Sequence, residues 1–259
     1  MPAILSANRC GAAPINSNES SSVPNSHRRS TPAIDQLSTQ DGTDDIYRAL
    51  YRGMEYIIVS AIKGHVAEFG TSSGRTAMTL AKGLADYGNK YIVSEEAHEI
   101  GLRKLLLFDG FEGFPAAIHP IDQASPHIAC GIWGPGVTKD ASAAILREMC
   151  ESHLPSDRIE IREGWYRETM PTLHAGLELA FVHIDCDFYE STMDVLDRLF
   201  TIDALSDGCA IYFDDWYCNR GSPNFGEQRA WADCVAKYRP RFTDWGPYAT
   251  VGHRFLIHK

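Results

Sequence analysis

The chain has 259 residues and a formal net charge of -10 at pH 7, and 44% of its residues are hydrophobic. This length suits one large α/β domain with its own core, and the acidic balance disfavours nucleic acids and anionic membranes as partners. No apolar run is long enough to cross a bilayer, and the first residues lack a secretory pattern. The seven cysteines contain no CxxC or CxxxC pair, so we expect reduced thiols, no zinc site and a cytoplasmic location.

The N-terminal part of the chain, residues 1–40, is rich in Ser, Asn and Pro. Such a segment buries too little apolar surface to offset the entropy of ordering, so we expect a disordered tail. Apolar residues recur at helical spacing from Thr43 to about residue 62, which predicts a helix with Thr43 as its N-cap. We therefore predict one folded domain over residues 41–259.

After this helix, apolar runs typical of buried strands alternate with segments of helical spacing. Strands are predicted at residues 65–70, 104–111, 158–165, 179–187, 209–215 and 253–259, and helices at 75–88, 140–153, 191–200 and 227–238. The alternation predicts a parallel sheet with helices on both faces, and ligands bind such sheets at the carboxyl ends of the strands. The segment at about residues 112–140 is rich in Pro, Gly and aromatic residues, and we expect it to form a lid.

The stretch VAEFGTSSGRTA, residues 66–77, predicts a strand, a glycine turn and the start of a helix. Gly70 and Gly74 would let a ligand approach the backbone closely, because neither carries a Cβ atom. A dinucleotide-binding turn has the spacing GxGxxG, and the middle glycine is absent here. The turn of S-adenosylmethionine (SAM)-dependent methyltransferases is the alternative, and the spacing alone leaves both open.

Asp109 ends the predicted strand in LLLFDGFEGFP. A carboxylate at this position can accept hydrogen bonds from both hydroxyls of a ribose, although an aspartate of a simple turn would look the same. An alternative strand at residues 90–96 would offer Glu95 or Glu96 for the same purpose.

Two acidic pairs follow neighbouring apolar strands, Asp185 with Asp187 and Asp214 with Asp215. Carboxylates brought together repel each other, and a hard divalent cation such as Mg²⁺ would relieve this repulsion. Asp187 and Asp215 could instead cap the helices that follow them. An Asp-x-Asp after an apolar strand also occurs in metal-dependent glycosyltransferases, but that alternative leaves the glycine turn and the second pair unexplained.

The motifs VAEFGTSSGRTA, LLLFDGFEGFP, REGWYRETMP, FVHIDCDFYEST and IYFDDW occur in this order. Together they resemble the macrocin O-methyltransferase family, whose members methylate sugar hydroxyls on macrolides and related natural products. The resemblance covers roughly residues 45–259. It implies a Rossmann-like, class I SAM-dependent methyltransferase fold with a seven-strand, mostly parallel sheet in which one strand near the C-terminus is antiparallel.

The resemblance also implies roles for individual residues. The methionine end of SAM would be lined by Glu68, Gly70, Thr71, Ser72 and Thr76, with Gly74 and Asp185 also close to SAM. Asp109 would hold the ribose, and Gly164 and Trp165 would lie near the adenine. Asp185, Asp214 and Asp215 match the family's magnesium ligands, and Asp187 matches its proposed general base.

The expected activity is therefore Mg²⁺-dependent transfer of a methyl group from SAM to a hydroxyl of a small molecule with neighbouring hydroxyls, a sugar on a glycosylated secondary metabolite. A catechol-type or N-methyltransferase on the same fold is the nearest alternative, and a non-catalytic scaffold has no need of clustered carboxylates. The resemblance also favours a homo-oligomer. His183 is expected to pack in the core, and His253 is a second candidate for the general base.

Overall fold

The computed structural model describes residues 43–91 and 102–259. The tail predicted at residues 1–40 lies outside this range, and so do Glu95 and Glu96. Lys90 and Tyr91, with which the alternative strand would begin, belong instead to a helix.

The described residues form a seven-stranded sheet with the strand order β3-β2-β1-β4-β5-β7-β6. Its strands are β1 His65–Phe69, β2 Leu105–Asp109, β3 Ile159–Glu163, β4 Leu179–Ile184, β5 Leu205–Phe213, β6 Arg241–Tyr248 and β7 Gly252–His258. β1 to β5 pair in parallel, whereas β7 is antiparallel to both β5 and β6. The predicted seven-strand, mostly parallel sheet with one reversed strand near the C-terminus is therefore confirmed.

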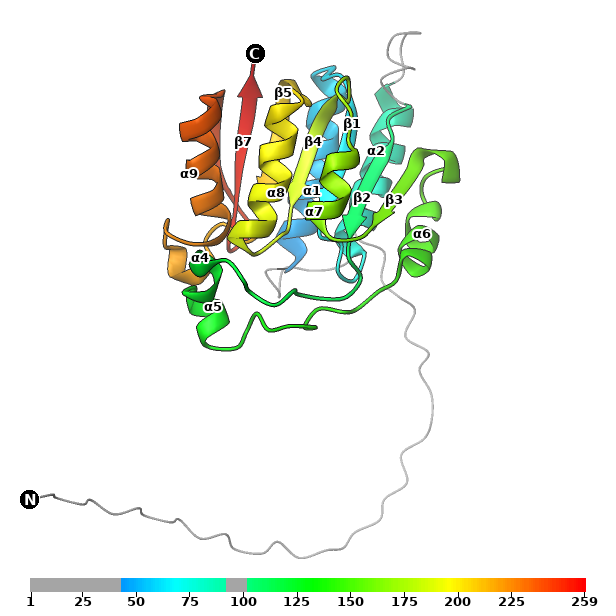
Figure 1. The fold of residues 1–259 in the computed structure, drawn as a ribbon. Coiled ribbons are helices and arrows are strands. Elements are labelled where there is room, and N and C mark those ends of the chain that lie inside the picture. Colours follow the sequence, from blue (N-terminus) through cyan, green and yellow to red (C-terminus); the bar gives the residue numbers. More distant parts are fainter. Residues whose placement is uncertain (1–42, 92–101) are drawn as a thin grey trace, which may run out of the picture. The chain divides into compact units, whose positions relative to one another are not determined.

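Helices cover both faces of the sheet (Figure 1). The longer helices are α1 Thr43–Val59, α2 Arg75–Tyr91, α6 Ala143–Glu151, α8 Tyr189–Thr201 and α9 Gly226–Tyr238. Short ones are α4 Pro120–Gln123, α5 Pro126–Ala129 and α7 Tyr166–Thr169, with 3-10 turns η2 Ser156–Arg158, η3 Met170–Thr172 and η4 Asn219–Gly221. None of these described helices is both long and apolar enough to span a membrane.

Each face of the sheet has its own apolar core. On one face, α1, α2 and α6 bury side chains such as Met54, Leu80 and Leu146. On the other face, α8 and α9 bury side chains such as Leu196 and Trp231. Every residue of β4 is buried, as expected for a central strand covered on both sides. Burial of each large side chain contributes roughly 1.5–3 kcal/mol, and this holds the carboxyl ends of the strands in fixed positions.

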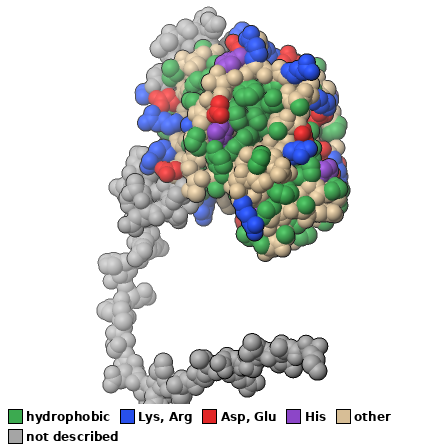
Figure 2. Space-filling view, turned by 90° about the vertical axis from the view of Figure 1, so that its left-hand side faces the viewer, with side chains coloured by type: hydrophobic (Ala, Val, Ile, Leu, Met, Phe, Trp, Pro, Cys, Tyr) green, Lys and Arg blue, Asp and Glu red, His purple; other side chains and the backbone are tan. Residues whose placement is uncertain are grey.

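The sequence pattern does not predict β6, because its first four residues are exposed and they lack an apolar alternation. β6 is the edge of the sheet beyond β7, where one side of a strand faces solvent. Figure 2 views the molecule from the side of α9, β6 and β7, where hydrophobic side chains gather in the middle of the face. Phe242 of β6 and Tyr217, which follows β5, are 37% and 40% exposed.

Candidate active site at the carboxyl edge of the sheet

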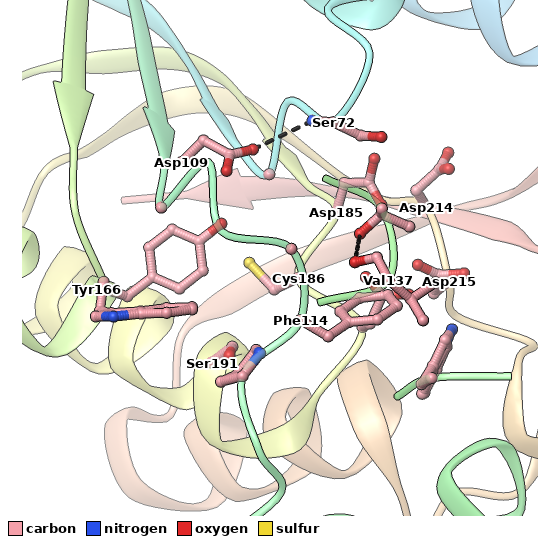
Figure 3. A pocket seen from close by; sticks show the side chains of 18 of the residues that line it. Ser72, Asp109, Phe114, Val137, Tyr166, Asp185, Cys186, Ser191, Asp214 and Asp215 are labelled. Carbon is pink, nitrogen blue, oxygen red and sulfur yellow. Dashed lines mark hydrogen bonds between the residues drawn. The ribbon is translucent and has the colours of Figure 1, made fainter. Parts of the chain in front are cut away.

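The carboxyl ends of β1, β2, β4 and β5 border a cavity of about 450 Å³ (Figure 3). Predicted site residues that line it are Gly70, Ser72, Asp109, Gly164, Trp165, Asp185, Asp187, Asp214 and Asp215. Parallel strands place their carboxyl ends at one edge, so residues from distant parts of the sequence meet here. Figure 3 shows Asp109 on one side of the cavity and Asp185, Asp214 and Asp215 on another.

Four predicted residues do not line the cavity: Glu68, Thr71, Gly74 and Thr76. Thr71 is buried within the glycine turn. Gly74 has a φ of +78°, and a Cβ atom there would lie 3.0 Å from Leu146 of α6. The small size of Gly74 therefore serves the packing of the turn against α6. Thr76 lies half-buried in the first turn of α2.

Gly70 allows two strand ends to approach each other. Its φ is +91°, and a Cβ atom at this position would lie 1.9 Å from the carbonyl oxygen of Asp185. The Asp185 N–H donates to the carbonyl of Phe69 at 2.9 Å, which joins the ends of β1 and β4. A side chain at position 70 would push the first acidic pair away from the glycine turn.

Asp109 holds the glycine turn in place. Its Oδ2 accepts hydrogen bonds from the backbone N–H groups of Thr71 and Ser72, at 2.7 and 3.1 Å, and from the Thr71 hydroxyl at 3.0 Å. Its Oδ1 accepts from the N–H of Phe111 at 2.7 Å. A carboxylate has about four acceptor positions, so the turn and Phe111 occupy most of them.

A buried chain of polar groups lies beneath the acidic pairs. The Glu68 carboxylate is 2.8 Å from His183 Nδ1, and His183 Nε2 is 3.7 Å from Asp214 Oδ1. Burial lowers the pKa of His183, but the carboxyl groups of Asp214 and Glu68 outweigh this and raise the pKa well above its usual value. A protonated His183 would balance the charge of these acids. The prediction that His183 packs in the core agrees with its complete burial.

Three carboxyl groups converge at the cavity wall. Asp185, Asp187 and Asp215 each offer an oxygen, and these oxygens all lie within 4.8 Å of one another. This group shares Asp185 and Asp215 with the predicted set of magnesium ligands but contains Asp187 in place of Asp214. The Oδ1 atom of Asp214 instead accepts from the Tyr248 hydroxyl at 3.0 Å.

The converging acids have strongly perturbed protonation. Burial raises the pKa values of Asp185 and Asp187 well above their usual range, and repulsion from neighbouring carboxyl groups raises them further. Burial also raises the pKa of Asp215. Glu227 lies buried beside them: its Oε2 accepts from the Asp215 N–H at 3.0 Å, and its Oε1 has no hydrogen-bond partner among the described residues. Excess negative charge with an unpaired oxygen suits a cation.

Asp187 has a backbone conformation that is rare for a residue with a side chain. Its φ is +58°, in the left-handed region, and such strain often occurs at functional sites. Gly226 lies against it, because a Cβ atom at Gly226 would be 2.9 Å from the carbonyl oxygen of Asp187. The start of α9 therefore helps to define where the Asp187 carboxylate lies.

The 112–140 segment passes along the carboxyl edge of the sheet, from β2 to α4 and α5 and back toward α6 (Figure 1). Two backbone hydrogen bonds join its two ends. The Phe114 N–H donates to the carbonyl oxygen of Val137 at 2.9 Å, and the Gly136 N–H donates to the carbonyl oxygen of Phe114 at 3.0 Å. A Lys139–Glu112 ion pair at 2.8 Å lies beside this junction.

The far part of the 112–140 segment is attached at two further points. The buried Asp122 carboxylate accepts from the N–H groups of Tyr189 and Glu190, at 2.7 and 3.1 Å, and so caps the start of α8. Asn219 of η4 donates its N–H to His127 Nδ1 at 2.9 Å, and the His127 N–H donates to the Asn219 Oδ1 at 3.1 Å.

Sequence reasoning missed Asp122, Asn219, Glu227 and Tyr248. Asp122 follows a proline at the start of a short helix, which is a common place for an acid, so its tertiary role left no distinct signal. His253, the second candidate base, lies outside the described cavity wall. Its ring nitrogens are 3.1 Å from the Tyr217 hydroxyl and 2.7 Å from Asp244, so both are engaged there.

Comparison with known proteins gives two kinds of similarity. The model of the macrocin-O-methyltransferase (TylF) family matches residues 39–231. A tetracenomycin rhamnosyl 4'-O-methyltransferase from Streptomyces olivaceus is 25% identical over 203 residues, which is 76% of this chain and 66% of that protein. The mycinamicin III 3''-O-methyltransferase from Micromonospora griseorubida is 29% identical over 170 residues, 64% of this chain and 59% of that protein. The chain thus matches less than two thirds of the length of either relative.

Two solved structures share the fold. The O-methyltransferase NovP superposes with a TM-score of 0.63 at 19% identity, covering 83% of this chain and 81% of NovP. A calicheamicin methyltransferase gives a TM-score of 0.59 at 20% identity, covering 89% of this chain and 99% of the other. These similarities identify the sheet and its helices as the class I methyltransferase fold.

Proposed function

The chain belongs to the macrocin-O-methyltransferase (TylF) family, and from this premise we propose that it transfers a methyl group from SAM to a hydroxyl of a small molecule. The acceptor we propose is a sugar on a glycosylated secondary metabolite, since two relatives are named for methylation of such compounds. We further propose that the reaction depends on Mg²⁺.

One observation carries the proposal: the oxygens of Asp185, Asp187 and Asp215 lie within 4.8 Å of one another, in the same cavity as the glycine turn. SAM needs a site that spans the glycine turn and the ends of β2 and β3. Ser72, Asp109, Gly164 and Trp165 lie along that path. The carboxyl groups then lie at the end where the reactive methyl group would be, which is where an acceptor hydroxyl has to bind.

The donor set fits a hard cation. Mg²⁺ takes oxygen ligands at about 2.0–2.1 Å, so opposite ligands are about 4 Å apart. The oxygens of Asp185 and Asp215 lie within 4.8 Å of each other, so a bound ion would draw them closer together. Asp185 and Asp215 belong both to this group and to the ligand set that the family resemblance implies, so we propose them as the core of the site. Asp214 is the third ligand in our proposal, and it retains an oxygen that does not bond to Tyr248.

The proposed chemistry is a direct displacement. The acceptor oxygen forms a bond to the methyl carbon as the sulfonium bond breaks, and S-adenosylhomocysteine leaves with the electron pair. A bound Mg²⁺ would lower the pKa of the attacking hydroxyl. Asp187 accepts the proton of that hydroxyl, and burial raises the pKa of Asp187 above that of an exposed aspartate, which makes its carboxylate a stronger base. Asp109 and the amide groups of the turn hold the shape of the SAM site.

The glycosyltransferase and scaffold alternatives find no support in this family. A catechol-type acceptor or a nitrogen nucleophile stays an alternative, and methylation of matched hydroxyl and amine compounds would separate them.

Isothermal titration of SAM into metal-stripped protein, repeated with Mg²⁺, tests the proposal. We expect SAM to bind in both conditions and a separate Mg²⁺ signal to vanish in Asp185→Asn and Asp215→Asn. The control is Asp157→Asn, which removes an exposed carboxylate on η2 and should leave both signals unchanged. Absence of SAM binding would refute the methyltransferase proposal. SAM binding without a Mg²⁺ signal would refute only its metal dependence.

A further inference from the structure

The first turn of α9 holds the backbone that carries the second acidic pair. The Oε2 atom of Glu227 accepts from the Asp215 N–H at 3.0 Å. The next residue, Gln228, donates from its Nε2 atom to the carbonyl oxygen of Trp216 at 2.6 Å. Both bonds act on the two residues from which the chain continues after Asp214. The start of α9 therefore fixes the backbone from which the Asp215 carboxylate projects.

Glu227 is a buried acid among other acids. Acids are common in the first turn of a helix, where the helix dipole favours them, but Glu is rarely buried completely unless it is paired. Glu227 is 1% exposed, and the carboxyl groups of Asp185, Asp214 and Asp215 repel its charge. Its Oε1 atom has no hydrogen-bond partner among the described residues. The helix dipole alone therefore does not account for a carboxylate at this position.

Support of the Asp215 N–H does not account for the charge of Glu227 either. The amide oxygen of a glutamine could accept the same hydrogen bond, and a neutral side chain would avoid the repulsion. A divalent cation at Asp185 and Asp215 reverses this balance, because each nearby carboxylate then attracts the ion. Residues that support metal ligands without touching the metal commonly change its affinity by roughly 10–100-fold.

We infer that Glu227 is a positioning residue of the cation site, which holds Asp215 through its backbone N–H and strengthens Mg²⁺ binding with its negative charge from outside the ligand set. This inference rests on the Mg²⁺ dependence in the proposed function and adds a residue to it. The charge of Glu227 should destabilise the metal-free protein and stabilise the metal-bound protein. A residue with a purely structural role would not give these opposite effects.

The variant Glu227→Gln tests the role of the charge, because it keeps an oxygen for the Asp215 N–H, and Gln228 still holds Trp216. Isothermal titration should show Mg²⁺ binding about tenfold more weakly than to the unchanged protein. S-adenosylhomocysteine should bind to both proteins equally, since a general structural defect is not expected. The Tm of the metal-free variant should be no lower than that of the unchanged protein, because a buried repulsion has been removed.

The variant Glu227→Ala tests the role of the hydrogen bond, because it removes the acceptor oxygen as well as the charge. Mg²⁺ should bind to it about threefold more weakly again than to Glu227→Gln. Glu148→Gln is the matched control, since Glu148 is an exposed acid on α6 that lines none of the described hollows. This control should change Mg²⁺ affinity by less than about twofold, because solvent screens an exposed charge.

Two results with Glu227→Gln would each overturn the inference: a loss of Mg²⁺ affinity below about threefold, or a metal-free Tm below that of the unchanged protein. Equal Mg²⁺ affinity in Glu227→Gln and Glu227→Ala would overturn the positioning role through the backbone N–H. The proposed function fails separately. Absence of SAM binding refutes the methyltransferase, and absence of Mg²⁺ binding to the unchanged protein refutes its metal dependence together with this inference.

Discussion

Asp122 connects the 112–140 segment to α8, the helix that follows the first acidic pair. Removal of its carboxylate should therefore lower the free energy of unfolding. Its side chain is 2% exposed, and its two oxygens accept from the N–H groups of Tyr189 and Glu190, the first residues of α8. Asp122→Ala leaves both N–H groups without this acceptor. The change should loosen the segment from α8 and weaken the support of Asp187, two residues before Tyr189.

The magnitude follows from these two contacts. A hydrogen bond to a charged group contributes roughly 1.5–3 kcal/mol, and loss of a helix N-cap ordinarily costs about 0.5–2 kcal/mol. Burial opposes the gain, because it raises the pKa of Asp122 and disfavours its charged form. We expect Asp122→Ala to lower the free energy of unfolding by about 2 kcal/mol, which corresponds to a fall in Tm of roughly 4–8 °C in a domain of this size.

Urea and thermal unfolding, followed by circular dichroism, measure this loss. Asp122→Asn keeps one acceptor oxygen and should lose about half as much stability. Asp157→Ala, which removes an exposed acid on η2, should change the free energy of unfolding by less than about 0.5 kcal/mol, as is usual for surface sites. A loss below about 0.5 kcal/mol in Asp122→Ala would refute the reasoning, because the two contacts would then contribute nothing net.

Three further outcomes are expected. In metal-free protein, burial raises the pKa values of Asp185 and Asp187 well above the usual range of an aspartate. The folded state then binds more protons than the unfolded state, so Tm should fall as pH rises from about 4.5 to 7.5. Asp185→Asn should flatten this slope, and a rise in Tm over the same pH range would contradict the prediction. Gly70→Ala should lower the free energy of unfolding by more than about 3 kcal/mol. Gly131 also has a positive φ, +79°, but a Cβ atom added there would meet nothing within 4 Å, so Gly131→Ala should lower the free energy of unfolding by only about 1–2 kcal/mol. Equal losses in the two variants would refute the role of the contact with Asp185. Asp187→Asn should still bind SAM and Mg²⁺, but its turnover number should fall at least about 100-fold, as expected on removal of a general base. If the variant no longer binds Mg²⁺, Asp187 is a metal ligand and not the base.

Much of the fold could be predicted because its strands are long apolar runs that end in polar residues. β4 is buried along its whole length, so its sequence carries a strong signal. β6 carries no such signal, since an edge strand needs no apolar face and five of its eight residues are exposed. The short helices α4 and α5 also escaped prediction, because each is a single turn within a segment of irregular composition.

The sequence predicted which residues form the candidate site better than it predicted which atoms they contact. The acids fall at strand ends, and a parallel sheet brings strand ends together. Which oxygen faces which neighbour depends on backbone angles that the sequence does not reveal, such as the φ of +58° at Asp187. Asp109 was expected to face a ribose, and its bonds to the turn depend on tertiary geometry. The roles predicted for these residues stay predictions.

The junction between the two ends of the 112–140 segment has a consequence for protein engineering. Because Phe114 pairs with Gly136 and Val137, the residues between them form a closed loop, and the entropy of closing such a loop grows only slowly with its length. Residues 115–135 could therefore be exchanged as a cassette, or lengthened, without a change in the sheet. A transplanted cassette would have to bring its own carboxylate for the start of α8, or that helix would lose its cap.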